Sequence, residues 1–153
     1  RLGEACEMIR RLYAEPTVDF EGRYYELKEA RCEPKPVQRP HPPFVIGGSG
    51  ERLTLRVVAQ YADVWNFVGG SAEEFARKAG ILHEHGAAVG RDPAEIRHSV
   101  QIPVTYDDLP GTAEAVQRYV DTGATHLVLN LRPPYPDGIV ARLASDVVPR
   151  VRG

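Results

Sequence analysis

The sequence predicts an α/β fold of four consecutive βα units, arranged either as half of an eight-unit barrel or as a small open, doubly wound sheet. Four short apolar stretches, 44–46, 62–68, 98–104 and 125–131, alternate with stretches whose apolar residues recur at helical spacing. The strands are apolar through most of their length, which is typical of parallel strands covered by helices. In either arrangement, ligands gather at the carboxyl ends of the strands.

Composition narrows the class of protein. The 153 residues suit one domain or one piece of a larger one, and 42% hydrophobic with 26% charged residues is ordinary for a globular chain. The formal net charge is −2 and the basic residues are scattered, so we expect no nucleic-acid partner. No apolar run is long enough for a bilayer and no signal-peptide pattern opens the chain, so we expect no membrane partner. Cys6 and Cys32 form no CxxC motif, which fits a reducing cytoplasm.

The first 43 residues are predicted to precede the βα units. Leu2, Cys6, Ile9 and Tyr13 share one helical face, with Cys6 as a buried thiol, and Pro16 ends this helix. The helix opens without an N-cap, so we expect the chain to be cut from a longer one. Residues 17–43 are expected to form a surface hairpin that turns at Glu21-Gly22, followed by an extended proline-rich excursion, and 44–153 the four units of a single fragment, 1–153.

The remaining elements are predicted from the spacing of apolar residues and from the glycines and helix caps that interrupt it. Residues 51–61 are predicted to be helical, and Gly69-Gly70 stops the second strand. Ser71 and Glu74 form a capping box for the next helix, which Gly90 ends. Residues 107–111 are expected to form a polar loop before a fourth helix from about Ala113. The predicted apolar faces of the third and last helices comprise Phe75, Ala79, Leu82, Gly86 and Val89, and Ile139, Leu143 and Val147, respectively.

The stretch from strand 44–46 into the helix contains three glycines within four positions, Gly47, Gly48 and Gly50, together with Ser49. A strand, a glycine-rich turn and a helix present free backbone N–H groups to an anion. We interpret the turn as a pocket for the phosphate of a nucleotide-like cofactor; the alternative is a tight βα turn that binds nothing. Leu53 occupies the place where a dinucleotide fingerprint needs a small residue, and no Gly-Lys-Ser/Thr follows, so neither specific motif is present.

Several other residues are candidates for the functional site, and each also has a purely structural interpretation. Trp65 and Asn66 lie near the carboxyl end of the second strand, where they suit a barrel mouth; the alternative for Trp65 is a core side chain with its N–H satisfied. His126 and Asn130 have the same parity on the last strand, so both are placed to point into a barrel or into a packed interior. Arg132, just after the last strand, is placed to bind a substrate anion; the alternative is a solvated arginine in a loop.

No self-contained catalytic constellation is present. His83 and His85 are two apart on a helix and point in different directions, so they are a poor metal pair and are expected to face solvent. Asp107 and Asp108 are adjacent and do not face each other as an acid/base pair would. No Ser-His-Asp, Cys-His or metal-ligand cluster stands out, so a hydrolase and a metal centre are disfavoured.

Several stretches in register resemble the bacterial luciferase-like monooxygenase family, and most of all its deazaflavin (coenzyme F420)-dependent oxidoreductases. The resemblance implies a (β/α)8 TIM barrel of which this chain is the C-terminal half, and this agrees with the count of four βα units. It covers almost the whole chain. The stretches that carry it are 20–25, 33–38, 43–50, 61–66, 90–96 and 123–131.

The family resemblance also implies a cofactor and a reaction. Members bind F420, or alternatively FMN, at the barrel mouth and transfer a hydride to or from a small-molecule substrate, or activate oxygen. The matching turn binds the cofactor phosphate through backbone N–H groups. The resemblance therefore implies that Gly47, Gly48, Ser49 and Gly50 bind the cofactor. Glu51, Trp65 and Asn66 are included as further cofactor-binding positions next to this turn.

The first four strands of the family barrel are absent from the sequence. Because those strands carry the residues that hold the cofactor ring and the acid/base groups, no catalytic residue is assigned and the chain alone is expected not to catalyse. Its open edges are expected to be covered by a second copy or by an N-terminal half-barrel. Two alternatives remain: a non-catalytic half-barrel that self-associates, and a small stand-alone α/β phosphate-binding module.

Overall fold

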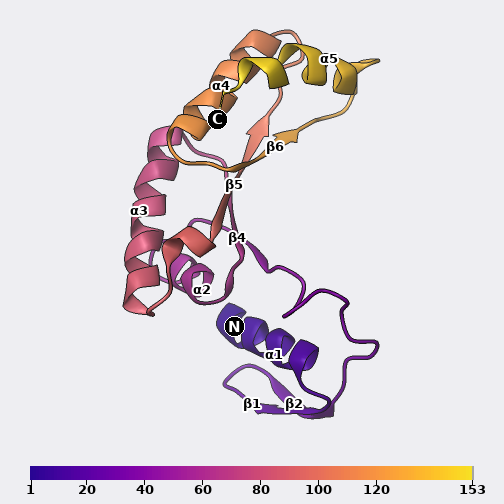
Figure 1. Ribbon diagram of the computed structural model, residues 1–153, viewed down its shortest axis with the longest axis vertical. Coiled ribbons are helices and arrows are strands. Elements are labelled where there is room, and N and C mark those ends of the chain that lie inside the picture. The colour runs from indigo at the N-terminus through magenta and orange to yellow at the C-terminus, as the bar shows by residue number, and fades with distance from the viewer. Residues whose placement is uncertain (153) are drawn as a thin grey trace.

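The computed structural model describes residues 1–152 and contains a four-stranded parallel sheet and a two-stranded antiparallel hairpin (Figure 1). The parallel strands follow the order β3-β4-β5-β6, and one helix follows each of them. The elements are α1 (Leu2–Ala14), β1 (Val18–Glu21), β2 (Glu26–Ala30), β3 (Val45–Gly47), α2 (Thr54–Tyr61), β4 (Val64–Val68), α3 (Ala72–Ala88), β5 (Arg97–Pro103), α4 (Leu109–Asp121), β6 (His126–Asn130) and α5 (Ile139–Asp146), with short 3₁₀ turns at Pro93–Glu95 and Val148–Arg150.

The strand order decides between the two predicted arrangements. A doubly wound sheet reverses its strand order at a switch point, whereas a barrel adds each new strand beside the previous one. Here every strand pairs with its sequence neighbour. The four βα units are therefore a partial (β/α)8 barrel, and that prediction is confirmed.

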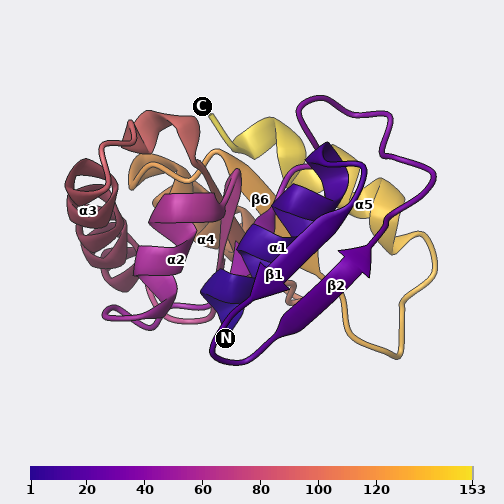
Figure 2. The same ribbon diagram turned by 90° about the horizontal axis from the view of Figure 1, so that it is seen from below.

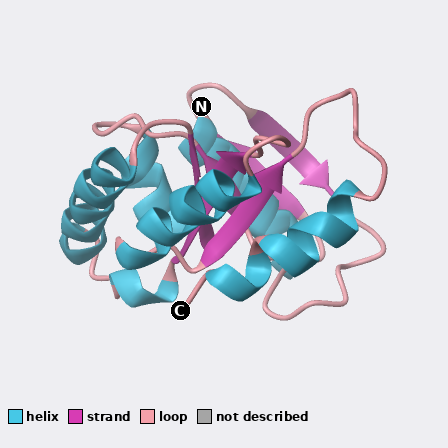
Figure 3. Cartoon of the chain, turned by 90° about the horizontal axis from the view of Figure 1, so that it is seen from above, coloured by secondary structure: helices cyan, strands magenta, loops and turns pink. Residues whose placement is uncertain are grey.

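The two faces of the sheet differ sharply. Helices α2 to α5 cover one face, as Figures 1 and 3 show, and most of the side chains that point to them are buried: Ile46, Trp65, Phe67, Val100 and Ile102. The other face is the one that lines the interior in a complete barrel, and there Val45, Val68 and Val128 are 62%, 56% and 36% exposed. Register places Gly47, Asn66, Ser99 and His126 side by side in one row across this concave face.

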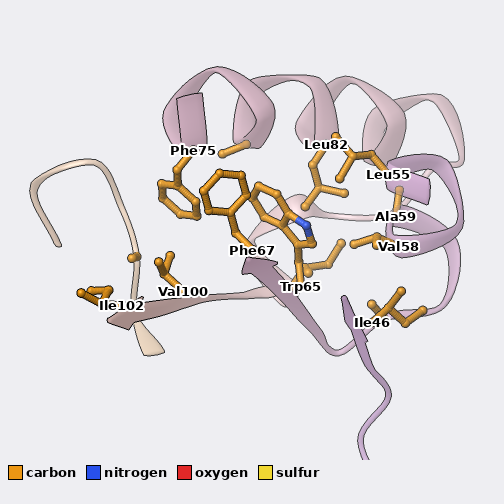
Figure 4. Close-up of a cluster of buried hydrophobic side chains, with 14 of the residues drawn as sticks. Ile46, Leu55, Val58, Ala59, Trp65, Phe67, Phe75, Leu82, Val100 and Ile102 are labelled. Carbon is orange, nitrogen blue, oxygen red and sulfur yellow. The ribbon is translucent and has the colours of Figure 1, made fainter. Parts of the chain in front are cut away.

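Trp65 is at the centre of the core between the sheet and the helices (Figure 4). Its ring stacks on Phe75 of α3 with centroids 5.4 Å apart and meets Phe67 edge-on at 5.7 Å. All three side chains are fully buried. Burial of a large apolar side chain contributes about 1.5–3 kcal/mol to the free energy of folding, so this cluster fixes β4 against α3.

Two helix starts differ from the prediction because local capping decides them. Helix α2 begins at Thr54 rather than at 51, since the Leu55 N–H reaches back to the Gly50 carbonyl at 3.0 Å and leaves 51–53 as turn. Helix α4 begins at Leu109, within the predicted loop, because the Asp108 carboxylate accepts from the Gly111 N–H at 2.8 Å.

The start of helix α3 agrees with the prediction, but its predicted apolar face includes one residue too many at the C-terminal end. Ser71 Oγ accepts from the Glu74 N–H at 3.2 Å, which is one of the two bonds of the predicted capping box; the Glu74 carboxylate pairs with Lys78 at 2.7 Å. Val89 lies just beyond the last helical residue and is 42% exposed, so its predicted place on the apolar face was wrong.

The N-terminal helix and hairpin form a layer at one end of the molecule (Figure 2). Glu4 of α1 accepts from the backbone N–H groups of Arg23 and Tyr24, which ties the hairpin turn to the helix. Cys6 is buried against the main core, as predicted. Across residues 1–152, no helix has both the length and the apolar character needed to cross a membrane.

Candidate functional site

The Gly-rich turn lies at the carboxyl end of β3, directly before α2. Gly48 has φ +114°, a conformation that side-chain-bearing residues rarely adopt, and its N–H donates to the Asn66 carbonyl at 3.2 Å. Within residues 1–152, the backbone N–H groups of Ser49, Gly50 and Glu51 have no protein acceptor. Consecutive unpaired N–H groups at the start of a helix are donors for an anion.

Two ring side chains hold the turn from below. Trp65 Nε1 donates to the Gly48 carbonyl at 2.8 Å, and His85 Nε2 donates to the Glu51 carbonyl at 2.8 Å. Trp65 is fully buried, so it acts on the turn from the core instead of lining the mouth. His85 is half-buried against the turn, so the prediction that it faces solvent was wrong. Both hydrogen bonds engage carbonyl oxygens of the turn, so neither of them uses the N–H groups of Ser49, Gly50 and Glu51.

An ion pair flanks the turn. Arg77 of α3 contacts the Glu51 carboxylate at 2.8 Å. The hydrogen bond from Arg77 and its positive charge hold the pKa of Glu51 below its usual value. Because the Glu51 charge is paired, it opposes the approach of an anion less than a free carboxylate would.

Thr54 also belongs to the turn, although sequence reasoning did not select it. A Cβ on Gly50 would lie 3.0 Å from Thr54 Oγ1, and a Cβ on Gly48 would lie 3.1 Å from Thr54 Cγ2. The Thr54 side chain therefore packs directly under both glycines and brings a hydroxyl next to the unpaired N–H groups. A serine or threonine four positions after a Gly-rich turn is a weak signal, since such residues are common at helix starts.

Asn66 lies beside the turn on the concave face, where it pairs in register with Gly47. Its Oδ1 is buried and has no hydrogen-bond partner among the described residues. A buried acceptor without a partner costs free energy, so a donor brought to this atom would stabilise the site. In the same row, His126 Nδ1 lies 2.9 Å from Ser99 Oγ.

Two further regions lie at the carboxyl edge of the sheet. Arg132 follows β6, and its backbone is held twice by the Tyr106 hydroxyl, which donates to the Arg132 carbonyl at 2.6 Å and accepts from its N–H at 2.9 Å. A cleft of about 540 Å³ lies between the start of α3 and α4. Tyr119 closes one side of it by donating from its hydroxyl to the Gly70 carbonyl at 2.7 Å.

The structure brings together most of the predicted site residues. The turn residues, Trp65 and Asn66 are adjacent, with Trp65 beneath and Asn66 beside. His126 and Asn130 share the concave face, but two strands, β4 and β5, lie between them and the turn.

The family of the chain follows from comparison with known proteins. The model of the luciferase-like monooxygenase family matches residues 1–142. The chain belongs to this family. Its N-terminal helix, hairpin and first three βα units all fall within the match.

The curated relatives of this family member include F420-dependent oxidoreductases. An F420-dependent glucose-6-phosphate dehydrogenase of Kineococcus radiotolerans is 26% identical over 206 aligned positions, which cover 99% of this chain and 60% of the relative. An uncharacterised protein of Mycobacterium bovis is 27% identical, with 90% of this chain and 44% of that protein covered. The chain thus spans about half the length of the curated relatives it matches.

Solved structures confirm the partial barrel. An F420-dependent secondary alcohol dehydrogenase in complex with an F420–acetone adduct has a TM-score of 0.85 at 18% identity, covering 98% of this chain and 61% of that one. The coenzyme F420-dependent tetrahydromethanopterin reductase of Methanopyrus kandleri has a TM-score of 0.77 at 13% identity, covering 97% and 62%. A type II Baeyer–Villiger monooxygenase from Pseudomonas putida in complex with FMN has a TM-score of 0.66 at 10% identity, covering 97% and 62%.

Proposed function

We propose that this chain supplies the phosphate-binding part of the cofactor site in a luciferase-like oxidoreductase. The observation that carries the proposal is the row of unpaired N–H groups at Ser49, Gly50 and Glu51. A phosphate accepts from several N–H groups at once and is favoured at a helix N-terminus. The hydrogen bonds from Trp65 and His85 preorganise the turn, so little conformational entropy is lost on binding.

The cofactor we favour is F420, with FMN as the alternative. Both carry a phosphate and a hydroxyl-bearing chain. Several relatives and structural neighbours are named for F420, whereas two neighbours are named with FMN or a modified FMN. The phosphate fits the N–H row, and a hydroxyl of the chain fits the unpaired Asn66 Oδ1. The bound cofactor supplies the hydride chemistry; the residues of this chain bind and orient it.

The substrate we propose is a small molecule that exchanges a hydride with the cofactor in the complete barrel. The four strands described here leave the concave face open, with Val45, Val68 and Val128 exposed. Open edges at β3 and β6 favour a partner that continues the sheet. We infer that this partner is an N-terminal half-barrel or a second copy of the chain, and that the chain alone is inactive.

The test is a titration of the purified chain with F420 and with FMN, followed by fluorescence, with gel filtration of the same samples. Gly48→Ala is expected to weaken binding about tenfold or more, because a distorted turn loses N–H donors that are each worth about 1 kcal/mol. The matched control is Gly90→Ala: Gly90 also has a positive φ, +70°, but it lies after α3, away from the turn. The affinity of Gly90→Ala for either cofactor is expected to equal that of the unaltered chain.

Three results would contradict parts of this proposal. Equal weakening by both glycine variants would mean that strain acts through global stability and not through the turn. A folded, self-associated chain that binds neither cofactor would be a non-catalytic half-barrel. A monomer that binds phosphate without preferring either cofactor would be a stand-alone phosphate-binding module.

A further inference from the structure

We propose that the barrel of this chain is completed by a segment of four parallel strands and three helices, and not by a second copy of the chain. This partner is one of the two named in the proposed function, so the inference rests on the open partial barrel but not on the cofactor assignment. The segment meets the chain at two places, the free edge of β3 and the free edge of β6. The position of α1 decides which partner fits.

The helices form one continuous row outside the sheet. Helix α1 packs on α2, α2 on α3, α3 on α4 and α4 on α5. Figures 1 and 2 show α1 on the far side of α2 from α3. Because β3 has no neighbouring strand on that side, α1 covers the place where the helix of a preceding barrel strand packs. The described chain thus has five α-helices for four barrel strands.

Helix α1 is held in this place by its packing on α2. Cys6 of α1 is buried in the main core together with Leu55 and Val58 of α2. The Arg10 guanidinium lies 5.4 Å from the centroid of the Tyr61 ring at the end of α2. Because moving α1 aside would expose this apolar surface to water, the helix is a fixed part of the molecule.

The number of helices excludes a second copy as the partner. A closed (β/α)8 barrel has eight strands and one outer helix for each of them. Two copies would supply eight strands but ten α-helices, so α5 of one copy and α1 of the other would need the same place beside the junction of β6 with β3. Protein interiors are close-packed and cannot hold both helices there. A segment with only three helices avoids the conflict, because α1 then serves as the helix after its fourth strand.

The β6 side of the sheet offers the segment an apolar surface. A groove of about 280 Å³ lies beside this strand, and its lining is Val116, Leu127, Leu129, Val147, Val148 and Val151. Leu127 and Leu129 point to the helix side of the sheet, where the next strand and its helix pack in a closed barrel. The first strand and helix of the segment are therefore expected to bring apolar side chains to this groove.

Binding of two versions of one segment tests the proposal. The segment is the part of the F420-dependent secondary alcohol dehydrogenase that lies outside its superposition on this chain, which covers 61% of that protein. One version ends after the strand that precedes the match to α1, and the other continues through the helix that matches α1. Each version is expressed together with the full chain, and light scattering and a sedimentation dilution series give the stoichiometry and the affinity.

The shorter version is expected to form a one-to-one complex. The longer version is expected to bind at least about tenfold more weakly, because its last helix meets α1. Val148→Asp is also expected to weaken the complex, since it places an unpaired charge in the groove. The matched control is Val140→Asp: Val140 is 69% exposed on α5 and does not line the groove, so binding is expected to stay unchanged.

The strand register identifies the residues that would meet if two copies did close a barrel. The shear of a (β/α)8 barrel moves a row of neighbouring residues by about four positions in each half. The row that runs from Gly47 to His126 would then continue to Pro43 of a second copy. Val128 of one copy would lie opposite Val45 of the other, and both side chains are exposed in the single chain.

Crosslinking of these two positions tests the excluded partner. Val45→Cys and Val128→Cys are combined in a Cys32→Ser background, which removes a free, half-buried thiol. A short thiol crosslinker is expected to give no more covalent dimer than in the control that combines Val45→Cys with Val89→Cys, because Val89 lies after α3, outside the sheet. Preferential crosslinking of positions 45 and 128, equal binding of the two segment versions, or failure of the shorter version to bind would each overturn the proposal.

Discussion

Gly48 is the residue on which the geometry of the turn depends most directly. Its φ of +114° is accessible to glycine at little cost, the Thr54 side chain packs against it, and Trp65 donates to its carbonyl. Gly47, one position earlier, has no such requirement: an added Cβ would meet only the Asn66 carbonyl oxygen, at 3.9 Å. Adjacent glycines in one motif therefore have different physical roles.

This difference predicts unequal stability effects. Gly48→Ala is expected to lower the free energy of unfolding by about 1–3 kcal/mol, the usual cost of holding a side-chain-bearing residue in a disfavoured backbone conformation. Gly47→Ala is expected to change it by less than about 0.5 kcal/mol. Urea denaturation of the two variants measures both values. Equal losses would show that the positive φ of Gly48 is not maintained in solution.

His98 predicts how stability depends on pH. Because burial lowers its pKa in the folded state, the unfolded chain binds the proton more readily. The free energy of unfolding is therefore highest above the ordinary histidine pKa of about 6.5 and falls as the pH drops below it, by at most about 1.4 kcal/mol per pH unit.

The measurement is urea denaturation between pH 7.5 and 5. His98→Phe keeps an aromatic ring against Trp65 and Phe75 but cannot take up a proton. It is expected to lose this part of the pH dependence. An unchanged slope in His98→Phe would assign the effect to other groups.

At the scale of single elements, helix α3 links the fold to the candidate site. Its first turn is capped by Ser71, its middle packs Phe75 on Trp65, and its last turn brings His85 to the Glu51 carbonyl. Arg77 from the same helix pairs with Glu51. The position of one helix thus sets both the support beneath the turn and the charge beside it.

Loss of the cap tests that link. Ser71→Ala is expected to reduce the free energy of unfolding by about 1 kcal/mol, because the Glu74 N–H loses its acceptor. Ser71→Asp keeps an oxygen at the same place and is expected to retain most of the stability. Thermal unfolding followed by circular dichroism compares the two. A loss of stability in Ser71→Asp equal to that in Ser71→Ala would argue against capping as the cause.

The elements themselves were largely predictable, because apolar periodicity and glycine or proline punctuation reflect local physics. All four strands and the helices that follow them lie where the periodicity places them. The starts of α2 and α4 were predicted wrongly. The hydrogen bond from the Leu55 N–H to the Gly50 carbonyl and the Asp108 cap depend on turn geometry, which the periodicity of apolar residues does not report. The contacts of Arg77 and His85 with the turn depend on how α3 packs beside it, so sequence spacing carries no signal for them, and Thr54 carried only a weak one.

For the whole molecule, the consecutive strand order and the open concave face define a partial barrel. The row Gly47, Asn66, Ser99 and His126 runs across that face, so polar side chains from three strands, β4 to β6, lie side by side where a complete barrel encloses its interior. The sequence resemblance predicted the barrel and the family, and both are confirmed. The cofactor role of the turn remains a prediction, since it depends on a ligand.

The most direct test of that role is an amide chemical-shift titration of the ¹⁵N-labelled chain with F420, repeated with FMN. The unpaired N–H groups predict that the largest and saturable shifts occur at Ser49, Gly50 and Glu51, because a hydrogen bond to phosphate changes the environment of those protons most. Shifts confined to the cleft around Tyr119 and Gly70, with the turn amides unmoved, would contradict the assignment of the phosphate to the Gly-rich turn.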